Sequence, residues 1–197
     1  MKNIGIIIQA RTNSKRLKGK ILKKLGDKPL IEWVIKRLKK TKVNNIILAT
    51  SKNSKDLELR DICIKEKISF FNGSEKNVLE RFYQAAKQYK LDAIIRVCAD
   101  NPFVDSEEIN LLINKFKSNN FEDDYYFNHR NYEQNRYADG FGAELFKFST
   151  LEHLYKNPHQ SFWPLLQLDQ SQLNICPKSL YIVFCVFHND FLSVGHR

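Results

Sequence analysis

A concentration of positive charge follows the first apolar stretch of the chain. Residues 9–20 carry Arg11, Arg16 and Lys20, directly after the apolar residues 4–8. An arginine offers phosphate oxygens a planar fork of N–H donors, and a lysine offers them a compact positive charge. Charge alone would fit a solvent-exposed loop equally well. The place of the segment after a strand favours a loop that turns backbone N–H groups toward the phosphates of a nucleotide.

Carboxylates at strand ends are the candidates for a metal site. Asp100 follows the apolar run of residues 93–98. An acid at this place is often a turn residue, but it can also bind Mg²⁺, which takes few carboxylates together with phosphate oxygens and water. Asp139 and Glu144 are candidates for a second ligand, and they fit a loop aspartate and a strand-face glutamate equally well. Asp105 fits the start of the following helix.

Short apolar runs alternate with helical patterns as far as Asn119. Runs rich in β-branched residues predict buried strands at residues 4–8, 46–49, 68–71 and 93–98. Amphipathic patterns predict helices between them. This alternation predicts an α/β fold with a doubly wound, mostly parallel sheet. Ligands bind such sheets beyond the carboxyl ends of the strands, where residues 9–20 and Asp100 both fall.

Polar residues in front of apolar helical patterns mark the expected helix starts. A helix is expected over residues 78–89, and residues 141–148 read as a further strand, followed by a short helix. The expected N-caps are Asp27 (with Pro29 in the first turn), Asn77, Ser106 and Ser149.

The composition favours anionic partners. The 197 residues carry a formal net charge of +10, which suits nucleotides, acidic sugars or nucleic acid. No run approaches the roughly 20 apolar residues of a membrane helix, and the start does not read as a signal peptide, so we expect a cytoplasmic protein without membrane contact. The four cysteines show no C-x-x-C spacing and are expected to be reduced. No recognisable nucleic-acid-binding motif is present, so nucleic acid is not an expected partner.

The charged loop is neither a Walker loop nor a G-x-G-x-x-G fingerprint. It resembles the signature I-x-Q-A-R-x-x-S-x-R-L-P-G-K of the cytidylyltransferases that activate acidic sugars, especially those of spore-coat polysaccharide biosynthesis. Lys18 stands where that family usually has proline. The matching residues are Gln9, Ala10, Arg11, Ser14, Arg16, Leu17, Gly19 and Lys20.

Three further segments are similar to motifs of the same family, in the family's order. Residues 73–82 resemble G-x-x-x-D-V-L-x-R-Y, with Asn77 in place of the aspartate. Residues 96–105 resemble R-x-T-A-D-x-P-x-x-D, and residues 136–146 resemble Y-P-D-G-x-x-x-E-x-F. The resemblance covers about the first 157 residues and implies a GT-A-like, Rossmann-like nucleotidyltransferase fold.

The resemblance implies an Mg²⁺-dependent transfer of CMP from CTP to an acidic sugar. It implies that Gln9 and Ala10 help to recognise the base, and it favours the metal role for Asp100. The implied nucleotide-binding residues are Gln9, Ala10, Arg11, Ser14, Arg16, Lys20 and Arg81. The implied catalytic residues are Arg11, Lys20 and Asp100, the metal ligands Asp100 and Asp139, and the substrate contacts Arg136 and Glu144.

The chain changes character past residue 157. Residues 158–197 contain Lys178 and Arg197 as their cations, Asp169 and Asp190 as their acids and no glutamate, so the first 157 residues carry all of the net charge. We therefore expect a nucleotidyltransferase domain over residues 1–157 and an atypical segment, truncated or frame-altered, over residues 158–197. The alternatives are a glycosyltransferase of the same fold, an inactive truncated relative and a basic nucleic-acid-binding module; a homodimer stays open.

Overall fold

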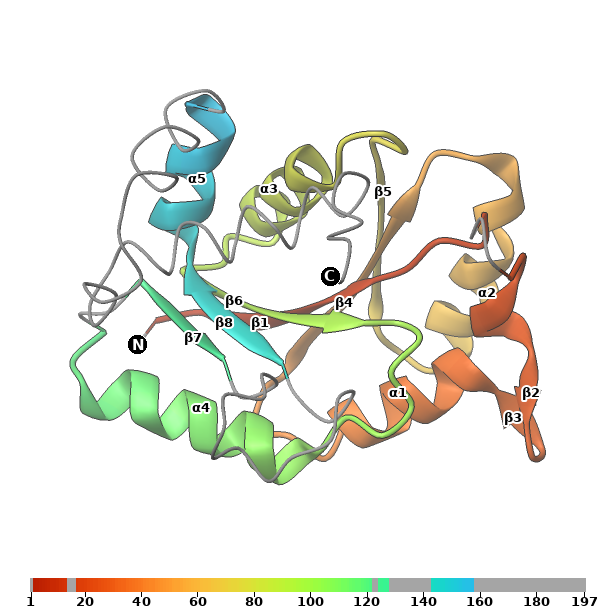
Figure 1. Ribbon diagram of the computed structural model, residues 1–197, viewed down its shortest axis with the longest axis horizontal. Coiled ribbons are helices and arrows are strands. Elements are labelled where there is room, and N and C mark those ends of the chain that lie inside the picture. The colour runs from red at the N-terminus through yellow and green to blue at the C-terminus, as the bar shows by residue number, and fades with distance from the viewer. Residues whose placement is uncertain (1, 14–16, 122–123, 128–142, 158–197) are drawn as a thin grey trace, which may run out of the picture.

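A six-stranded sheet with helices on both faces organises the molecule (Figure 1). The structure is a computed structural model and describes residues 2–13, 17–121, 124–127 and 143–157. The strand order is β5-β4-β1-β6-β8-β7. The strands are β1 (Ile4–Gln9), β4 (Asn45–Ser51), β5 (Ser69–Gly73), β6 (Ala93–Cys98), β7 (Tyr125–Phe127) and β8 (Glu144–Lys147).

The sheet is mostly parallel, as the alternation of elements predicts. β1 pairs in parallel with β4 on one side and β6 on the other, and β4 pairs in parallel with β5. β8 runs antiparallel to both β6 and β7. The antiparallel strand brings Glu144 opposite Arg96 of β6. The predicted strand over residues 141–148 is thus present as β8 in its described part, and Phe148 already begins a helix.

The helices form one layer on each face of the sheet. They are α1 (Leu30–Leu38), α2 (Glu58–Lys65), α3 (Val78–Gln88), α4 (Ser106–Ser118) and α5 (Phe148–Lys156). Successive residues of a strand point to opposite faces. Accordingly, Ile6 and Ile8 pack in a core with α1, α2 and α4, whereas Ile7 packs in a second core with α3 and α5. Figure 1 shows α1 and α4 below the sheet, and α3 and α5 above it.

The helix starts test the predicted caps. The Asn77 side chain accepts a hydrogen bond from the Glu80 N–H (2.9 Å) and caps α3, as predicted. Asp105 caps α4 by accepting from the Glu107 N–H (2.8 Å), so its expected place at the helix start is confirmed and the cap at Ser106 is wrong. The first residue of a helix and its cap are adjacent, and sequence alone separates them poorly.

Asp27 and Ser149 are not N-caps. The chain around Asp27 forms a hairpin in which β2 (Lys24–Leu25) pairs with β3 (Lys28–Pro29). Gly26 takes a φ of +69° in its turn, and α1 starts only after Pro29. Ser149 lies inside α5, whose N-cap is Lys147. Both errors come from reading a polar residue as a cap where a strand continues up to the helix. Among the described residues, no helix has the length and apolar character needed to cross a membrane.

Candidate active site at the carboxyl edge of the sheet

The charged loop leaves the centre of the sheet and is tied to both neighbouring strands. The Ala10 N–H donates to the Ala49 carbonyl of β4 (3.1 Å), and the Ala99 N–H after β6 donates to the Gln9 carbonyl (3.0 Å). The Gly19 N–H closes the loop on the Thr12 carbonyl (2.8 Å). Ala10 is buried, so in the described part the loop projects from a fixed base.

Gly19 directs the end of the loop. Its φ of +65° lies in the left-handed region, which residues with a Cβ atom rarely adopt. It precedes a 3₁₀ turn, η1 (Lys20–Leu22), in which Ile21 is buried in the core. A glycine here therefore lets the chain turn into η1 and places Lys20 at the carboxyl edge.

Lys20 and Asp100 meet at this edge. The Lys20 Nζ atom lies 3.1 Å from the Asp100 Oδ2 atom, and both side chains are about half exposed (43% and 48%). Asp100 directly follows β6, the strand beside β1. The structure thus brings together two residues that are 80 positions apart and that sequence analysis named as catalytic.

Asp56 fixes the start of the loop, and sequence analysis missed it. This buried carboxylate lies in η2 (Ser54–Asp56) and accepts hydrogen bonds from the Thr12 N–H (2.9 Å) and the Thr12 hydroxyl (2.5 Å). It also accepts from the Thr50 and Ser51 hydroxyls at the end of β4. Burial favours a higher pKa for Asp56, but the hydrogen bonds from Ser51, Thr12 and Thr50 outweigh it and lower that pKa.

Arg81 is a buried cation with unused donors. Only 1% of this α3 residue is exposed, and its Nη1 atom donates to the Ser74 carbonyl (2.6 Å). Its Nε and Nη2 atoms have no hydrogen-bond acceptor in the part of the chain that the structure describes. Burial, reinforced by the positive charge of Arg11, lowers the pKa of Arg81 to about 10. Two cations that disfavour each other in this way suit a bound anion.

Gln9, Arg96 and Glu144 form a connected row. Arg96 donates through Nε to the Gln9 Oε1 atom (3.1 Å) and through Nη1 to the Glu144 Oε1 atom (3.0 Å). Burial favours a lower pKa for Arg96, but its surroundings, including the charge and the hydrogen bond of Glu144, outweigh burial and raise that pKa. Arg96 was predicted as part of a strand and a motif, without a role; its signal is a charged residue inside an otherwise apolar strand.

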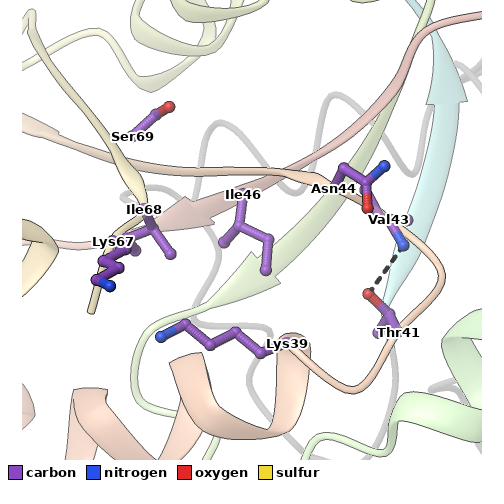
Figure 2. A pocket seen from close by; sticks show the side chains of 8 residues that line it. All are labelled: Lys39, Thr41, Val43, Asn44, Ile46, Lys67, Ile68 and Ser69. Carbon is purple, nitrogen blue, oxygen red and sulfur yellow. Dashed lines mark hydrogen bonds between the residues drawn. The ribbon is translucent and has the colours of Figure 1, made fainter.

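A separate hollow lies at the opposite edge of the sheet, where β4 and β5 begin (Figure 2). Figure 2 shows the side chains of Lys39 and Lys67 beside Ile46 and Ile68. The Lys39 Nζ atom pairs with the Glu66 Oε2 atom (2.6 Å). None of the predicted site residues lines this hollow.

The predicted site residues divide into two groups. Gln9, Ala10, Arg11, Lys20, Arg81, Asp100 and Glu144 are described, all on or beside the carboxyl half of the sheet. Ser14, Arg16, Arg136 and Asp139 lie outside the described residues. Among the described residues, no group of three or more His, Cys, Asp or Glu side chains comes together as a metal site.

Comparison with known proteins supports the resemblance. A family model described as cytidylyltransferase matches residues 5–163. An uncharacterised protein of Methanocaldococcus jannaschii is 41% identical over 163 residues, covering 82% of this chain and 63% of that protein. The spore coat polysaccharide biosynthesis protein SpsF of Bacillus subtilis is 39% identical over 118 residues, covering 57% and 49%. A 3-deoxy-manno-octulosonate cytidylyltransferase of Fusobacterium nucleatum is 36% identical over 127 residues, covering 60% and 48%.

Solved structures share the fold. A cytidylyltransferase from Leptospira borgpetersenii superposes with a TM-score of 0.74 at 29% identity, covering 96% of this chain and 72% of that one. The chain spans between about half and two thirds of the length of the three curated relatives.

Proposed function

This chain belongs to the cytidylyltransferase family, and from that premise we propose that it transfers CMP from CTP to a hydroxyl group of an acidic sugar. The observation that carries the proposal is the pairing of Lys20 with Asp100 at the mouth of the charged loop. A cation for phosphate oxygens and a carboxylate for a metal lie together beyond the carboxyl ends of parallel strands. This is the place at which such sheets bind nucleotides.

The cations of the site match a triphosphate. Arg11 and Lys20 lie in the described parts of the loop, and Arg81 offers two buried donor atoms from α3. In the transfer, the sugar oxygen forms a bond to the α-phosphorus and the bond from that phosphorus to the bridging oxygen breaks. Pyrophosphate leaves with the electron pair, and the hydroxyl proton passes to solvent. The arginines and Lys20 would stabilise the negative charge that collects on the leaving group.

Asp100 fits a role in holding Mg²⁺. Its carboxylate is half exposed, it stands next to the phosphate-binding cation, and oxygen donors are what Mg²⁺ prefers. Asp139 is the proposed second ligand and lies outside the described residues. When bound, the ion would neutralise phosphate charge and help to orient the α-phosphate.

The proposal of an acidic sugar as the acceptor rests on the names of two relatives. They are named for spore-coat polysaccharide biosynthesis and for 3-deoxy-manno-octulosonate, an acidic sugar. Arg136 is proposed to face the sugar carboxylate, whereas Glu144 is buried against Arg96 and away from the sugar. An enzyme that consumes CTP would work in the cytoplasm, where this nucleotide is made.

A thermal-shift panel tests the proposal. The wild type and Asp100→Ala are measured with CTP, UTP, ATP and GTP, each with and without Mg²⁺. Binding at a hundredfold excess over Kd stabilises a fold by about 2.7 kcal/mol. We expect a CTP-selective, Mg²⁺-dependent shift that Asp100→Ala loses, followed by pyrophosphate release when a sugar acid is added.

Lys156→Ala is the matched control, because it breaks an exposed ion pair with Glu152 (3.0 Å) on α5 without touching the loop. It should keep the full CTP shift. A wild-type protein whose melting temperature is raised by none of the four nucleotides would overturn the proposal. Release of a nucleotide from a nucleotide sugar, with no release of pyrophosphate from CTP, would identify a glycosyltransferase.

A further inference from the structure

The Gln9 side chain is held by a buried ion pair. Arg96 is 7% exposed and Glu144 is 2% exposed, and their contact of 3.0 Å joins β6 to the antiparallel strand β8. The second contact of Arg96, from Nε to the Gln9 Oε1 atom, joins the same pair to β1 (3.1 Å). Three strands therefore fix one amide group.

The donor set of arginine fixes how the amide points. A guanidinium has five N–H donors and no acceptor, so only the carbonyl oxygen of Gln9 can face Arg96. The Nε2 group of Gln9 then points away from Arg96. In the described ranges of the chain it has no hydrogen-bond acceptor, and Gln9 is only partly buried. The amide is therefore a fixed donor with both N–H bonds available.

The amide lies at the edge where the nucleotide is expected. Gln9 pairs with Ala49 and Cys98 as the last residue of β1, and it shares the sheet face of Ile7, which α3 covers. Arg11 follows it by two residues, and Cys98 precedes Asp100 by two. A ligand that bridges Arg11 and Asp100 would therefore lie at the end of β1, where Gln9 stands.

We propose that Arg96 and Glu144 hold Gln9 as a donor-only contact for the nucleotide base, which reads the N3 acceptor of cytosine. This proposal rests on the proposed function. Uracil carries an N–H donor at N3, so a donor held there would face a donor and leave both unpaired. Because Gln9 cannot turn its oxygen outward without abandoning Arg96, it cannot adapt to uracil. Arg96 and Glu144 are thus positioning residues for base selectivity.

Gln9→Glu is the sharpest test. Glutamate has the shape of glutamine, and one carboxylate oxygen can keep the contact with Arg96, so the fold loses no partner. The second oxygen then offers the base an acceptor in place of a donor. Its negative charge should weaken the binding of every triphosphate, so the quantity to compare is the ratio of the CTP and UTP dissociation constants, measured by calorimetry with Mg²⁺ and no sugar.

We expect Gln9→Glu to lower the preference for CTP over UTP at least tenfold. Arg96→Met should lower it too, because the freed amide can rotate; Gln9→Glu keeps the proposal testable if Arg96→Met fails to fold. Tyr83→Phe is the matched control, because it removes a side-chain hydrogen bond to Glu152 between α3 and α5 (3.2 Å), outside the site. It should keep the wild-type ratio.

The outcomes separate the two proposals. A wild type that prefers CTP, with the same preference in Gln9→Glu, would overturn the donor assignment alone. A wild type that binds CTP and UTP equally well would overturn both the donor assignment and the proposed function.

Discussion

Arg81 shows how a single ligand-binding residue can lower the stability of the ligand-free protein. It is buried, two of its donor atoms have no acceptor among the described residues, and Arg11 adds repulsion. Buried polar groups without partners normally destabilise a protein. Arg81 is also closely packed, because a Cβ atom added at Gly73 would lie only 3.1 Å from the Arg81 Cγ atom.

Arg81→Met should therefore have opposite effects on stability and on binding. Methionine fills similar space without a charge, so the ligand-free protein should keep its stability or gain about 1 kcal/mol. Its affinity for CTP should fall at least tenfold. Urea unfolding and calorimetry measure the two effects. Arg37→Met, at an exposed arginine of α1, serves as the control and should change neither. An Arg81→Met protein with full CTP affinity would remove Arg81 from the site.

Among the elements, one carboxylate adds a second contact between the loop and β4, beside the backbone bond from Ala10 to Ala49. Asp56 receives its hydrogen bonds from Thr12 on one side and from Thr50 and Ser51 on the other. These bonds favour the charged form and lower the pKa of Asp56 below its ordinary value of 3.8. The stabilisation is therefore complete above the unfolded pKa and is lost as the pH falls through the folded pKa.

Asp56→Asn should lower the free energy of unfolding by about 1–3 kcal/mol at pH 7, because an amide can accept fewer of these bonds. The difference from wild type should begin to shrink as the pH falls below the ordinary value of 3.8, where the unfolded chain takes up the proton first, and it should be lost as the pH falls through the lower folded pKa. Urea titrations at pH 7 and at successively lower pH values measure it. Thr50→Val removes one bond on the strand side and should cost less. A difference that stays constant with pH would mean that the charge of Asp56 is unimportant.

The strands that support the site could be predicted from the sequence, but its side-chain contacts could not. β1 is apolar as far as Ile8 and β6 is apolar apart from Arg96, and such runs indicate buried strands. The Asp27 and Ser149 caps failed because strand pairing decided where the helices begin. The contacts of Asp56 with Thr12 and of Arg96 with Glu144 were missed because each joins segments that are distant in the sequence, and no local pattern marks such a contact.

For the whole molecule, the division of the chain after residue 157 stays a proposal. The match ends at residue 163, close to the predicted boundary after residue 157. All of the net charge of +10 belongs to the part before that boundary. We keep a nucleotidyltransferase domain over residues 1–157 and an atypical segment over residues 158–197 as a proposal.

β1 is the strand from which the site grows, and it has a hydrogen-bonded neighbour on both sides. The amides of residues 6–8 and Ala10 should therefore exchange with solvent hydrogen only when the entire domain opens. The base of the site would then last as long as the fold itself. In rising urea, CTP binding and the native fluorescence should disappear together; binding lost at lower urea would show that the loop detaches while β1 is still paired.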